Sequence, residues 1–481
     1  MIRNSSGTAI DSLTYQSSWY NNPAGISLER KDPAALSIDK ANWALSTDER
    51  GSTPAEENSE FEPDVTPPGI IFANIFHPDS LEVVFSEFID LTNESTNSSN
   101  SNGMMANRLD QRNELPNNTR FLVNGSVSDL LEYDPAAGNR VVLSAAGISL
   151  GEPITLNVEN LGDFQGNISS EIEQPVAQPL QPADIVFNEI MYNPLADDRD
   201  GIPDQSDYIE IYNRRPYALS LEGIFLHDEP NENGQIVRID PITSSQRWIP
   251  ANGYALFYPE PSARPFTESR TAQFFELSED FAPFAFQSIR TTLSLPNTGR
   301  RVYLADSTRT VIDMVDYSPD WHNPNLVDTR GIALERINPD FETNDASNWS
   351  SNTTIQGGSP GRQNSIYQEP QFVGSDTGVF LDPNPFSPDG DGFEDNLFIN
   401  YNFDEPDYLL RVRIYDRYGR LVRTLAEGTA AGFQGSLIWD GLTDDGQRNR
   451  IGIYIVFVEA YNSSNGRNRA FRETAVLARQ F

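Results

Sequence analysis

The sequence contains no cysteine, which excludes disulfides, thiolate nucleophiles and cysteine-ligated zinc. Its only lysines are Lys31 and Lys40. The three histidines, His77, His227 and His322, lie far apart and in no spacing typical of metal ligands. We therefore expect no catalytic centre built on histidine.

Long apolar runs are also missing, and none approaches the ~20 residues that a membrane-spanning helix needs. No apolar segment follows Met1-Ile-Arg-Asn-Ser-Ser, so no signal peptide is expected at this end. The formal net charge is −36, a poor surface for nucleic acid, whose phosphates require clustered basic residues. An acidic, lysine-poor surface suits salty water, and a GC-rich genome that favours arginine codons explains the lack of lysine equally well.

The chain contains an internal repeat, in which motifs of the first sixty residues return between residues 312 and 365. A repeat of this kind marks a structural module that is used twice. Because only the second copy has a long upstream half, from about Asp184, we expect the chain to begin inside its first copy. The paired motifs are Ile10-Asp11 and Ile312-Asp313, Gly25-Ile-Ser-Leu-Glu-Arg30 and Gly331-Ile-Ala-Leu-Glu-Arg336, Asn42-Trp43 and Asn348-Trp349, and Asn58-Ser59 and Asn364-Ser365.

Short runs of alternating polar and apolar residues, separated by turn signals, predict an all-β chain of tandem sandwiches. Examples are Ser80–Phe85, Asp207–Tyr212, Arg411–Tyr415 and Gly452–Phe457. Shifts in composition, among them a proline-spaced stretch at 171–182 read as a stiff spacer, divide the chain. The predicted domains are 1–59, 64–172, 183–365 and 378–481.

Three segments resemble known families. Asp184–Pro194, Asp207–Asn213 and Trp248–Tyr254, followed by the repeated Glu-Arg and Asn-Trp motifs, resemble a lamin-tail domain of the secreted bacterial type. This resemblance implies an immunoglobulin-like sandwich for 183–365, and the C-terminal part of another such domain for 1–59. The segment that opens at Thr66-Pro-Pro68 and closes near Asp163-Phe-Gln-Gly-Asn167 is similar to the bacterial Ig-like domains of S-layer proteins.

The last hundred residues resemble an Ig-like C-terminal domain related to the flagellar hook-capping protein. The motifs that carry this resemblance are Asn384–Gly392, Ile414–Arg423, Trp439-Asp-Gly441 and Gly452-Ile-Tyr454. Close relatives in the Bacteroidota act as sorting signals for type IX secretion. The resemblance therefore implies an extracellular or outer cell-surface protein of Bacteroidota type, whose C-terminal domain serves sorting or anchoring.

Two acidic clusters are candidate calcium sites, because Ca²⁺ takes six to eight oxygen ligands from flexible loops. Solvated acidic turns are the alternative, since turn geometry alone favours Asp and Gly. Neither cluster has a nearby base, nucleophile or paired histidine, so no metal-dependent hydrolase is expected. The candidate ligands are Asp389, Asp391, Glu394 and Asp395 in the first cluster, and Asp197, Asp198, Asp200 and Asp204 in the second.

The one concentration of basic residues, arginines 411, 413, 417, 420 and 423, is read as a solvated face balanced by acids. The alternative is a contact surface for a secretion component or an anionic surface glycan. Trp43 and Trp349 follow asparagine in both copies, which favours packing in the sandwich over a carbohydrate-stacking platform.

We expect no enzyme. The favoured function is a structural or interaction region of an exported protein, with calcium as the one candidate cofactor. Its expected partners are the secretion machinery or a cell-surface component, with a surface glycan as a further candidate. One alternative is the accessory tail of an extracellular nuclease or phosphoesterase, and another is a calcium-dependent adhesin.

Overall fold

The structure is a computed structural model in which the chain divides into two compact units, residues 1–179 with 216–220, and residues 180–215 with 221–481. The residues that it describes are 2–3, 9–11, 13, 15, 24–33, 35–91, 115–133, 138–195, 204–236, 239–242, 247–260, 265–288, 292–324, 326–369, 377–404, 408–462 and 465–479.

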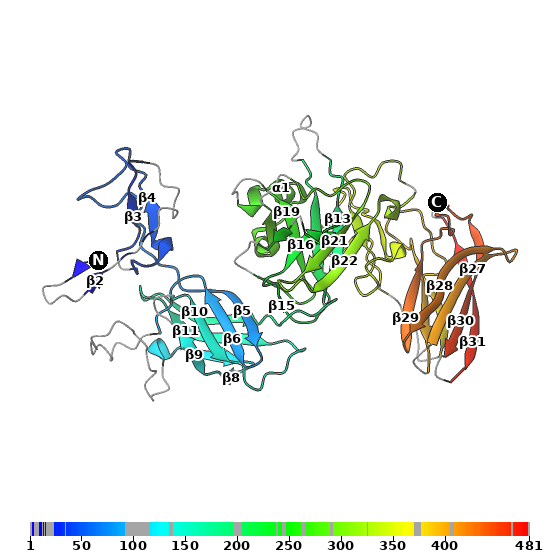
Figure 1. Ribbon diagram of the computed structural model, residues 1–481, viewed down its shortest axis with the longest axis horizontal. Coiled ribbons are helices and arrows are strands. Elements are labelled where there is room, and N and C mark those ends of the chain that lie inside the picture. Colours follow the sequence, from blue (N-terminus) through cyan, green and yellow to red (C-terminus); the bar gives the residue numbers. More distant parts are fainter. Residues whose placement is uncertain are drawn as a thin grey trace. The chain divides into compact units, whose positions relative to one another are not determined.

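The first unit begins with two small antiparallel pairs and continues with a sandwich of two four-stranded sheets (Figure 1). Alternation decides which side chains enter its core, because Leu81, Val83 and Phe85 are fully buried and their neighbours are not. The pairs are β1 (Ile2–Arg3) with β2 (Ala9–Asp11), and β3 (Leu28–Arg30) with β4 (Trp43–Leu45) after η1 (Lys40–Asn42). One sheet has the order β5 (Ile70–His77), β6 (Ser80–Phe85), β10 (Arg140–Ser144) and β9 (Leu130–Tyr133). The other has the order β12 (Ile168–Pro175), β11 (Thr155–Gly162), β7 (Arg120–Val123) and β8 (Ser126–Val127), and η3 (Pro116–Asn118) precedes β7.

Much of the stretch read as a stiff spacer at 171–182 is part of the sheet structure. Strand β12 runs to Pro175 and pairs with β11 along its length. Ala177 then bridges Asn74, and Gln178 bridges Leu219. Antiparallel pairing of β12 and these two parallel bridges occupy the backbone as far as Gln178, so Pro175 ends a strand and this part of the stretch is not a free connector.

The second unit begins with two sheets that form the next sandwich. The larger one has the order β20 (Ala285–Ser288), β19 (Tyr254–Pro259), β14 (Tyr208–Asn213), β13 (Ile185–Met191), β23 (Leu334–Arg336) and β24 (Trp349–Ser351). The smaller one has the order β17 (Ile239–Pro241), β16 (Phe225–Asp228), β21 (Arg300–Ala305) and β22 (Val311–Tyr317). Further elements of this unit are β18 (Trp248–Ile249), η4 (Phe266–Glu268), α1 (Arg270–Phe275), η5 (Glu279–Phe284), η6 (Pro319–Trp321) and η7 (Ala346–Asn348). The short strand β15 (Leu219–Ser220) belongs to the first unit.

Strand β13 is buried along its whole length, because both faces of the larger sheet are covered. One face packs against the smaller sheet, where the Phe187 N–H donates to Asp313 at 2.9 Å. Part of the other face packs under α1 and its neighbouring turns, where Tyr208 meets Phe275 edge to face with ring centroids 5.5 Å apart. The rest of that outer face carries the polar groups described below.

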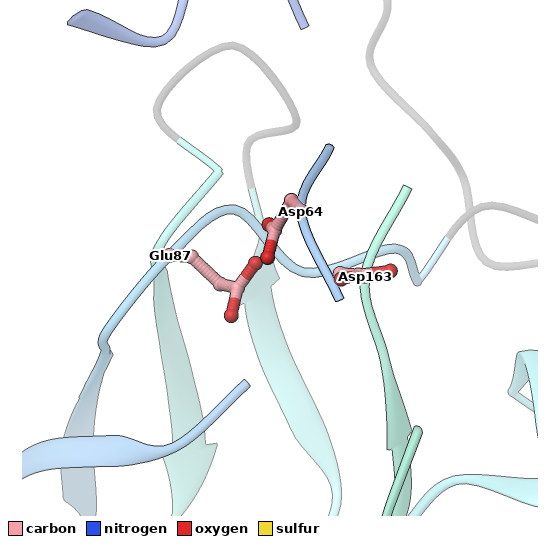
Figure 2. Close-up of side chains that lie close together, drawn as sticks. All are labelled: Asp64, Glu87 and Asp163. Atoms are coloured by element: carbon pink, nitrogen blue, oxygen red, sulfur yellow. The ribbon is translucent and has the colours of Figure 1, made fainter. Parts of the chain in front are cut away.

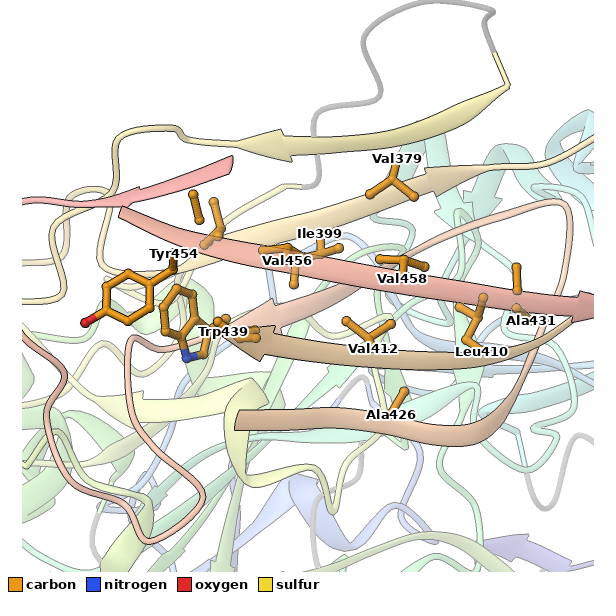
Figure 3. Packing of buried hydrophobic residues seen from close by; sticks show 14 of the residues in the cluster. Val379, Ile399, Leu410, Val412, Ala426, Ala431, Trp439, Tyr454, Val456 and Val458 are labelled. Atoms are coloured by element: carbon orange, nitrogen blue, oxygen red, sulfur yellow. The ribbon is translucent and has the colours of Figure 1, made fainter. Parts of the chain in front are cut away.

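The C-terminal sandwich of the same unit has its own core (Figure 3). Trp439 is fully buried, and its ring contacts Tyr454 edge to face at 5.2 Å. Ile337 and Ile366 form a second apolar cluster with Phe398 and Ile438, so residues on both sides of the stretch 367–377 pack together within this unit. One sheet has the order β25 (Gly378–Asp382), β26 (Leu397–Asn402) and β29 (Gln434–Trp439). The other has the order β28 (Leu421–Ala431), β27 (Tyr408–Asp416), β30 (Gly452–Asn462) and β31 (Asn468–Leu477). The chain is all-β with sandwiches, as the alternation predicted, and the sandwiches are immunoglobulin-like, as the family resemblances implied.

The two copies of the repeat form the same local structure. Trp43 Nε1 donates to Ser37 O at 3.0 Å, and Trp349 Nε1 donates to Thr343 O at 2.7 Å. Trp349 is only 3% exposed, which supports the prediction that it packs inside the sandwich. This burial argues against the alternative of a carbohydrate-stacking platform. Trp43 is half-buried, and Trp19 lies outside the described residues.

Candidate functional sites

The first predicted calcium cluster follows the start of the C-terminal sandwich, in the loop between β25 and β26. Asp389, Asp391 and Asp395 each place a carboxylate oxygen within 4.8 Å of the others, whereas Glu394 is not part of this group. Asp395 accepts hydrogen bonds from Gly390 N at 2.6 Å and Gly392 N at 2.8 Å. These two glycines have positive φ, which lets the loop curl around the carboxylate.

Two features of this loop favour a bound cation. The Oδ1 atom of Asp389 is buried without a hydrogen-bond partner. Burial raises the pKa of Asp395, and the charges of Asp391 and Asp389 add to this effect, although the two backbone N–H groups oppose it. Bringing these carboxylates together is costly, and a cation or a proton removes that cost.

A cavity of about 670 Å³ lies beside this loop, within the second unit. Its lining includes Trp321 and His322 from the end of η6, and Asp389, Asp395 and Arg423 from the C-terminal sandwich. Burial lowers the pKa of His322 to about 4, so its imidazole is neutral at pH 7. The Nδ1 atom of His322 shares a hydrogen bond with Ser351 Oγ at 2.8 Å, and its Nε2 atom is buried without a partner.

Most residues of the second predicted calcium cluster lie outside the part of the chain that the structure describes. Asp197, Asp198 and Asp200 lie outside the described residues. Asp204 is half-buried, and the nearby Asp207 accepts a hydrogen bond from Thr292 Oγ1 at 2.9 Å. Calcium binding at this loop stays a prediction.

A third carboxylate cluster, in the first unit, was missed by the sequence analysis. Asp64, Glu87 and Asp163 each place an oxygen within 4.8 Å of the others (Figure 2). Burial raises the pKa of Glu87 to about 8, and the negative charges of Asp64 and Asp163 contribute. A divalent cation with oxygen ligands, or a proton on Glu87, can neutralise this cluster.

The turn motif Asp163-Phe-Gln-Gly-Asn167 was the one sequence signal near this cluster. Asp163 Oδ1 accepts from Gln165 N at 2.9 Å and Asn167 N at 2.8 Å. Asn167 Nδ2 in turn donates to Asp64 O at 3.1 Å, which holds the acidic segment 60–64 over the turn. The motif therefore shapes a loop that positions its neighbours. Its sequence does not predict that Glu87 is the third member of the cluster.

Three glutamates lie side by side on the outer face of the larger sheet in the second unit. Glu189 on β13 is directly opposite Glu210 on β14 and Glu335 on β23. All three are fully buried, and the loop 357–366 covers them. Gly361 N donates to Glu210 at 2.5 Å and Ser359 N donates to Glu189 at 2.9 Å.

The protonation state of these glutamates follows from their burial. Burial raises the pKa of Glu189 well above its usual range, and the charges of Glu335 and Glu210 add to the shift. Burial also raises the pKa of Glu210 to about 8. Because adjacent buried carboxylates are costly to ionise together without a counter-charge, this arrangement favours the protonated form of Glu189.

Glu29 shows the same loop attachment in the first copy of the repeat. It accepts from Thr53 Oγ1 at 2.6 Å and from Ser59 N at 2.6 Å, as Glu335 accepts from Ser359 and Ser365. Burial opposes its ionisation, but hydrogen bonds from Thr53, Ser59 and Ser46 outweigh it and lower its pKa to about 2. The repeated Glu-Arg motif is therefore a structural anchor for the loop.

The predicted basic face is balanced by acids at its centre. Arg411 lies 2.6 Å from a Glu427 oxygen, and Arg413 lies 2.9 Å from the other. Arg420 pairs with Asp416 at 2.7 Å. The guanidinium of Arg417 lies 4.8 Å from the centre of the Tyr418 ring. These pairs favour the reading as a solvated face.

All three histidines of the sequence pack against aromatic rings. His227 stacks on Tyr303 at 4.9 Å, and its Nδ1 atom lies 2.7 Å from Asp228 O. His77 lies 4.9 Å from the ring centre of Phe76. His322 lies 5.6 Å from the ring centre of Tyr192.

The described helices include none that is long and apolar enough to cross a membrane.

Comparisons with known proteins match two segments of the chain to families. Residues 178–319 match the lamin tail domain, and residues 380–472 match the CHU_C type IX secretion signal domain. No curated protein matches the chain. The extents of all four predicted domains stay predictions.

Solved structures give distant similarities. The structure of dimeric latent PorU from Porphyromonas gingivalis is 12% identical, with 92% of this chain and 36% of that chain covered and a TM-score of 0.18. PorZ, a surface component of the type IX secretion system of the same organism, is 11% identical, with 85% and 45% covered and a TM-score of 0.16. The chain thus spans about a third of the length of PorU.

The family matches agree with the motifs at 184–254 and 384–454 that carried the two resemblances. They also agree with the all-β architecture of the second unit, which contains residues 380–472 and most of residues 178–319. Residues 178–319 thus match the lamin tail domain and are followed by a segment that matches the CHU_C type IX secretion signal domain, and these matches indicate export to the cell surface or the extracellular space.

Proposed function

We propose that this chain is a non-catalytic scaffold of an exported protein, in which successive β-sandwiches present interaction surfaces and the C-terminal sandwich serves secretion or attachment. The observation that carries the proposal is the match of residues 380–472 to a secretion signal domain. The hydrophobic core around Trp439 supports the proposal, because a secretion signal that is recognised as a folded domain requires a complete core.

The outer face of the C-terminal sandwich is the proposed contact surface for the secretion machinery. Ile453 and Ile455 on β30 are 53% and 38% exposed, and Leu421 on β28 is 51% exposed. Ile455 and Leu421 both lie opposite Tyr415 of β27, so they belong to one row across the sheet. Exposed apolar side chains that gather on one face are typical of a binding surface.

Export of the full chain in a type IX secreting bacterium tests both parts of the proposal. We expect a chain truncated after residue 377 to stay inside the cell. The double variant Ile453→Ser and Ile455→Ser should fold normally, since both positions are exposed, yet reach the surface poorly. The matched control is Val127→Ser, an exposed strand position of the first unit. Normal export of the truncated chain would contradict a secretion role for this domain.

A second candidate function is calcium binding by the loop 389–395, favoured by the buried, unpartnered Oδ1 atom of Asp389. We expect millimolar calcium to raise the melting temperature of the second unit relative to a chelator, because a ligand that binds only the folded state stabilises it. Asp389→Asn should remove most of the shift, whereas Asp404→Asn, on the loop after β26, should leave it. An unchanged melting temperature in calcium would exclude the site and the calcium-dependent adhesin.

A further inference from the structure

A small cavity opens on the outer face of the larger sheet of the lamin tail domain, at the end away from α1. Its volume is about 50 Å³, and its walls are Tyr212, Tyr254 and Tyr367 together with Pro339 and Gln363. Asn188 and Asn364, both almost fully buried, complete the lining. The lining residues come from β14, β19, β13 and the two loops that follow β23 and β24.

The sheet and the repeat motif hold the three tyrosines in place. Tyr212 and Tyr254 are cross-strand partners, and their rings are 5.0 Å apart at 42°. Tyr367 follows the anchored Asn364, whose Nδ2 atom donates to Arg336 O at 2.8 Å and to Asn188 O at 3.0 Å. The rings are all half-buried, so each keeps part of its surface open to solvent.

The electrostatics of this cavity favour a cation. The faces of tyrosine rings are negative, and several rings around one space form the cages that bind alkylammonium groups. Burial raises the pKa of all three tyrosines, and nearby carboxylates raise it further, namely Asp340 and Glu369 at the loops and Glu210 behind Tyr254. The loop carboxylates Asp340 and Glu369 therefore place negative charge near Tyr212 and Tyr367. Glu210, with a pKa of about 8, is mostly neutral at pH 7 and contributes little charge at Tyr254.

No cation of the described chain fills this role. The arginines that stack on aromatic rings in the described residues use Trp349, Tyr418 and Phe457. The nearest arginine in sequence, Arg214, directs its guanidinium to the carbonyl oxygens of Ala183 and Pro339. A cage with negative surroundings and no internal cation is the arrangement that an external ammonium group would complete.

We propose that Tyr212, Tyr254 and Tyr367 form a binding site for an alkylammonium cation, the chemistry shared by trimethylammonium groups and lysine side chains. The site is separate from the proposed secretion role, because none of its residues lies in the segment 380–472 that matches the secretion signal domain. Tyr212 and Tyr254 lie in the segment that matches the lamin tail domain, and Tyr367 follows that segment. The site gives the lamin tail domain a ligand class of its own.

Binding of choline to the full chain, measured by calorimetry and saturation-transfer NMR, tests the site. Its neutral isostere 3,3-dimethyl-1-butanol separates charge from shape, and Nα-acetyl-lysine amide supplies a primary ammonium. We expect choline or the lysine derivative to bind, with the tighter of the two naming the source, and the neutral alcohol to bind at least about tenfold more weakly. Equal binding of choline and the alcohol would overturn the proposal, as would no binding of either ammonium.

Ring substitutions locate the site. Tyr254→Leu and Tyr367→Leu should each weaken ammonium binding by about tenfold, whereas Tyr254→Phe, which keeps the ring face, should bind almost as the natural chain does. Tyr418→Leu, at an exposed tyrosine of the C-terminal sandwich, is the control. Because Tyr367 lies in a loop and is half-buried, its variant keeps the folded domain. Unchanged binding in Tyr367→Leu with a normal melting curve would place the cation elsewhere and refute the cage.

Discussion

At the scale of single residues, the raised pKa of Glu87 makes the stability of the folded state depend on pH. Glu87 lies between Asp64 and Asp163, and its pKa of about 8 in the folded state is well above the value of about 4.3 expected in the unfolded chain. Between these two values the folded state holds a proton that the unfolded state has lost. Stability must therefore fall as the pH rises through this window.

Replacing Glu87 by Gln should remove this pH dependence. We expect similar melting temperatures for the variant and the natural chain near pH 5, and a more stable variant at pH 9, because Gln needs no proton to lie beside two carboxylates. Thermal melting of the first unit at several pH values is the measurement. Glu171→Gln, at an exposed position on β12, is the control and should not flatten the profile. A profile unchanged by Glu87→Gln would mean that the cluster is already neutralised at high pH, for example by a bound cation.

At the scale of elements, the repeated asparagine before each tryptophan fastens one turn to the next. Asn348 accepts from Asn338 N and donates to Asn338 O, both at 3.0 Å, and it is fully buried. Asn42 makes the same pair of bonds with Asp32 in the first copy, at 2.7 and 2.9 Å. The side chain closes a ten-residue loop by copying the hydrogen bonds of a backbone partner.

Asn348→Ala should destabilise the second unit by about 1–3 kcal/mol, because the buried Asn338 N–H loses its partner and Asn338 O keeps only the hydrogen bond from Arg336 Nε at 3.3 Å. Asn42→Ala should act in the same way on the first unit. Urea unfolding followed by tryptophan fluorescence reports both effects. The exposed Asn233→Ala serves as the control, with a change within about 0.5 kcal/mol. If Asn348→Ala lowers the free energy of unfolding no more than the control does, water must replace the hydrogen bonds of the side chain to the backbone of Asn338.

Across the whole molecule, the net charge of −36 opposes the compact state through self-repulsion. Added salt screens this repulsion, with a Debye length that falls from about 10 Å at 0.1 M to about 3 Å at 1 M. The two compact units have separate cores, which favours separate unfolding transitions.

Sodium chloride should therefore raise the melting temperatures of both units between 0.05 and 0.5 M. Differential scanning calorimetry measures the two transitions, and sucrose at equal osmolality controls for general solute exclusion. A fall in both transitions with salt would mean that attractive ion pairs such as Arg411–Glu427 outweigh the repulsion.

Much of the local structure was predictable because it depends on neighbours in sequence. The alternation at Ser80–Phe85 predicted a strand with exactly those bounds, and Trp349 packs as the repeat suggested. The acidic loop at 389–395 curls as its glycines favour, although only three of its four predicted ligands meet. Glu394 is not part of the group, and its backbone has positive φ, a conformation that the sequence did not predict.

The sequence by itself determined the strands, the repeated module and the two families, since periodicity and ordered motifs are written along the chain. Only the tertiary structure decided which distant side chains meet. Asp64, Glu87 and Asp163, like Tyr212, Tyr254 and Tyr367, belong to segments whose adjacency depends on sheet order and loop docking. Alternation tells which face a side chain occupies, but not which strand will lie beside it, and the candidate sites of this protein depend on that second choice.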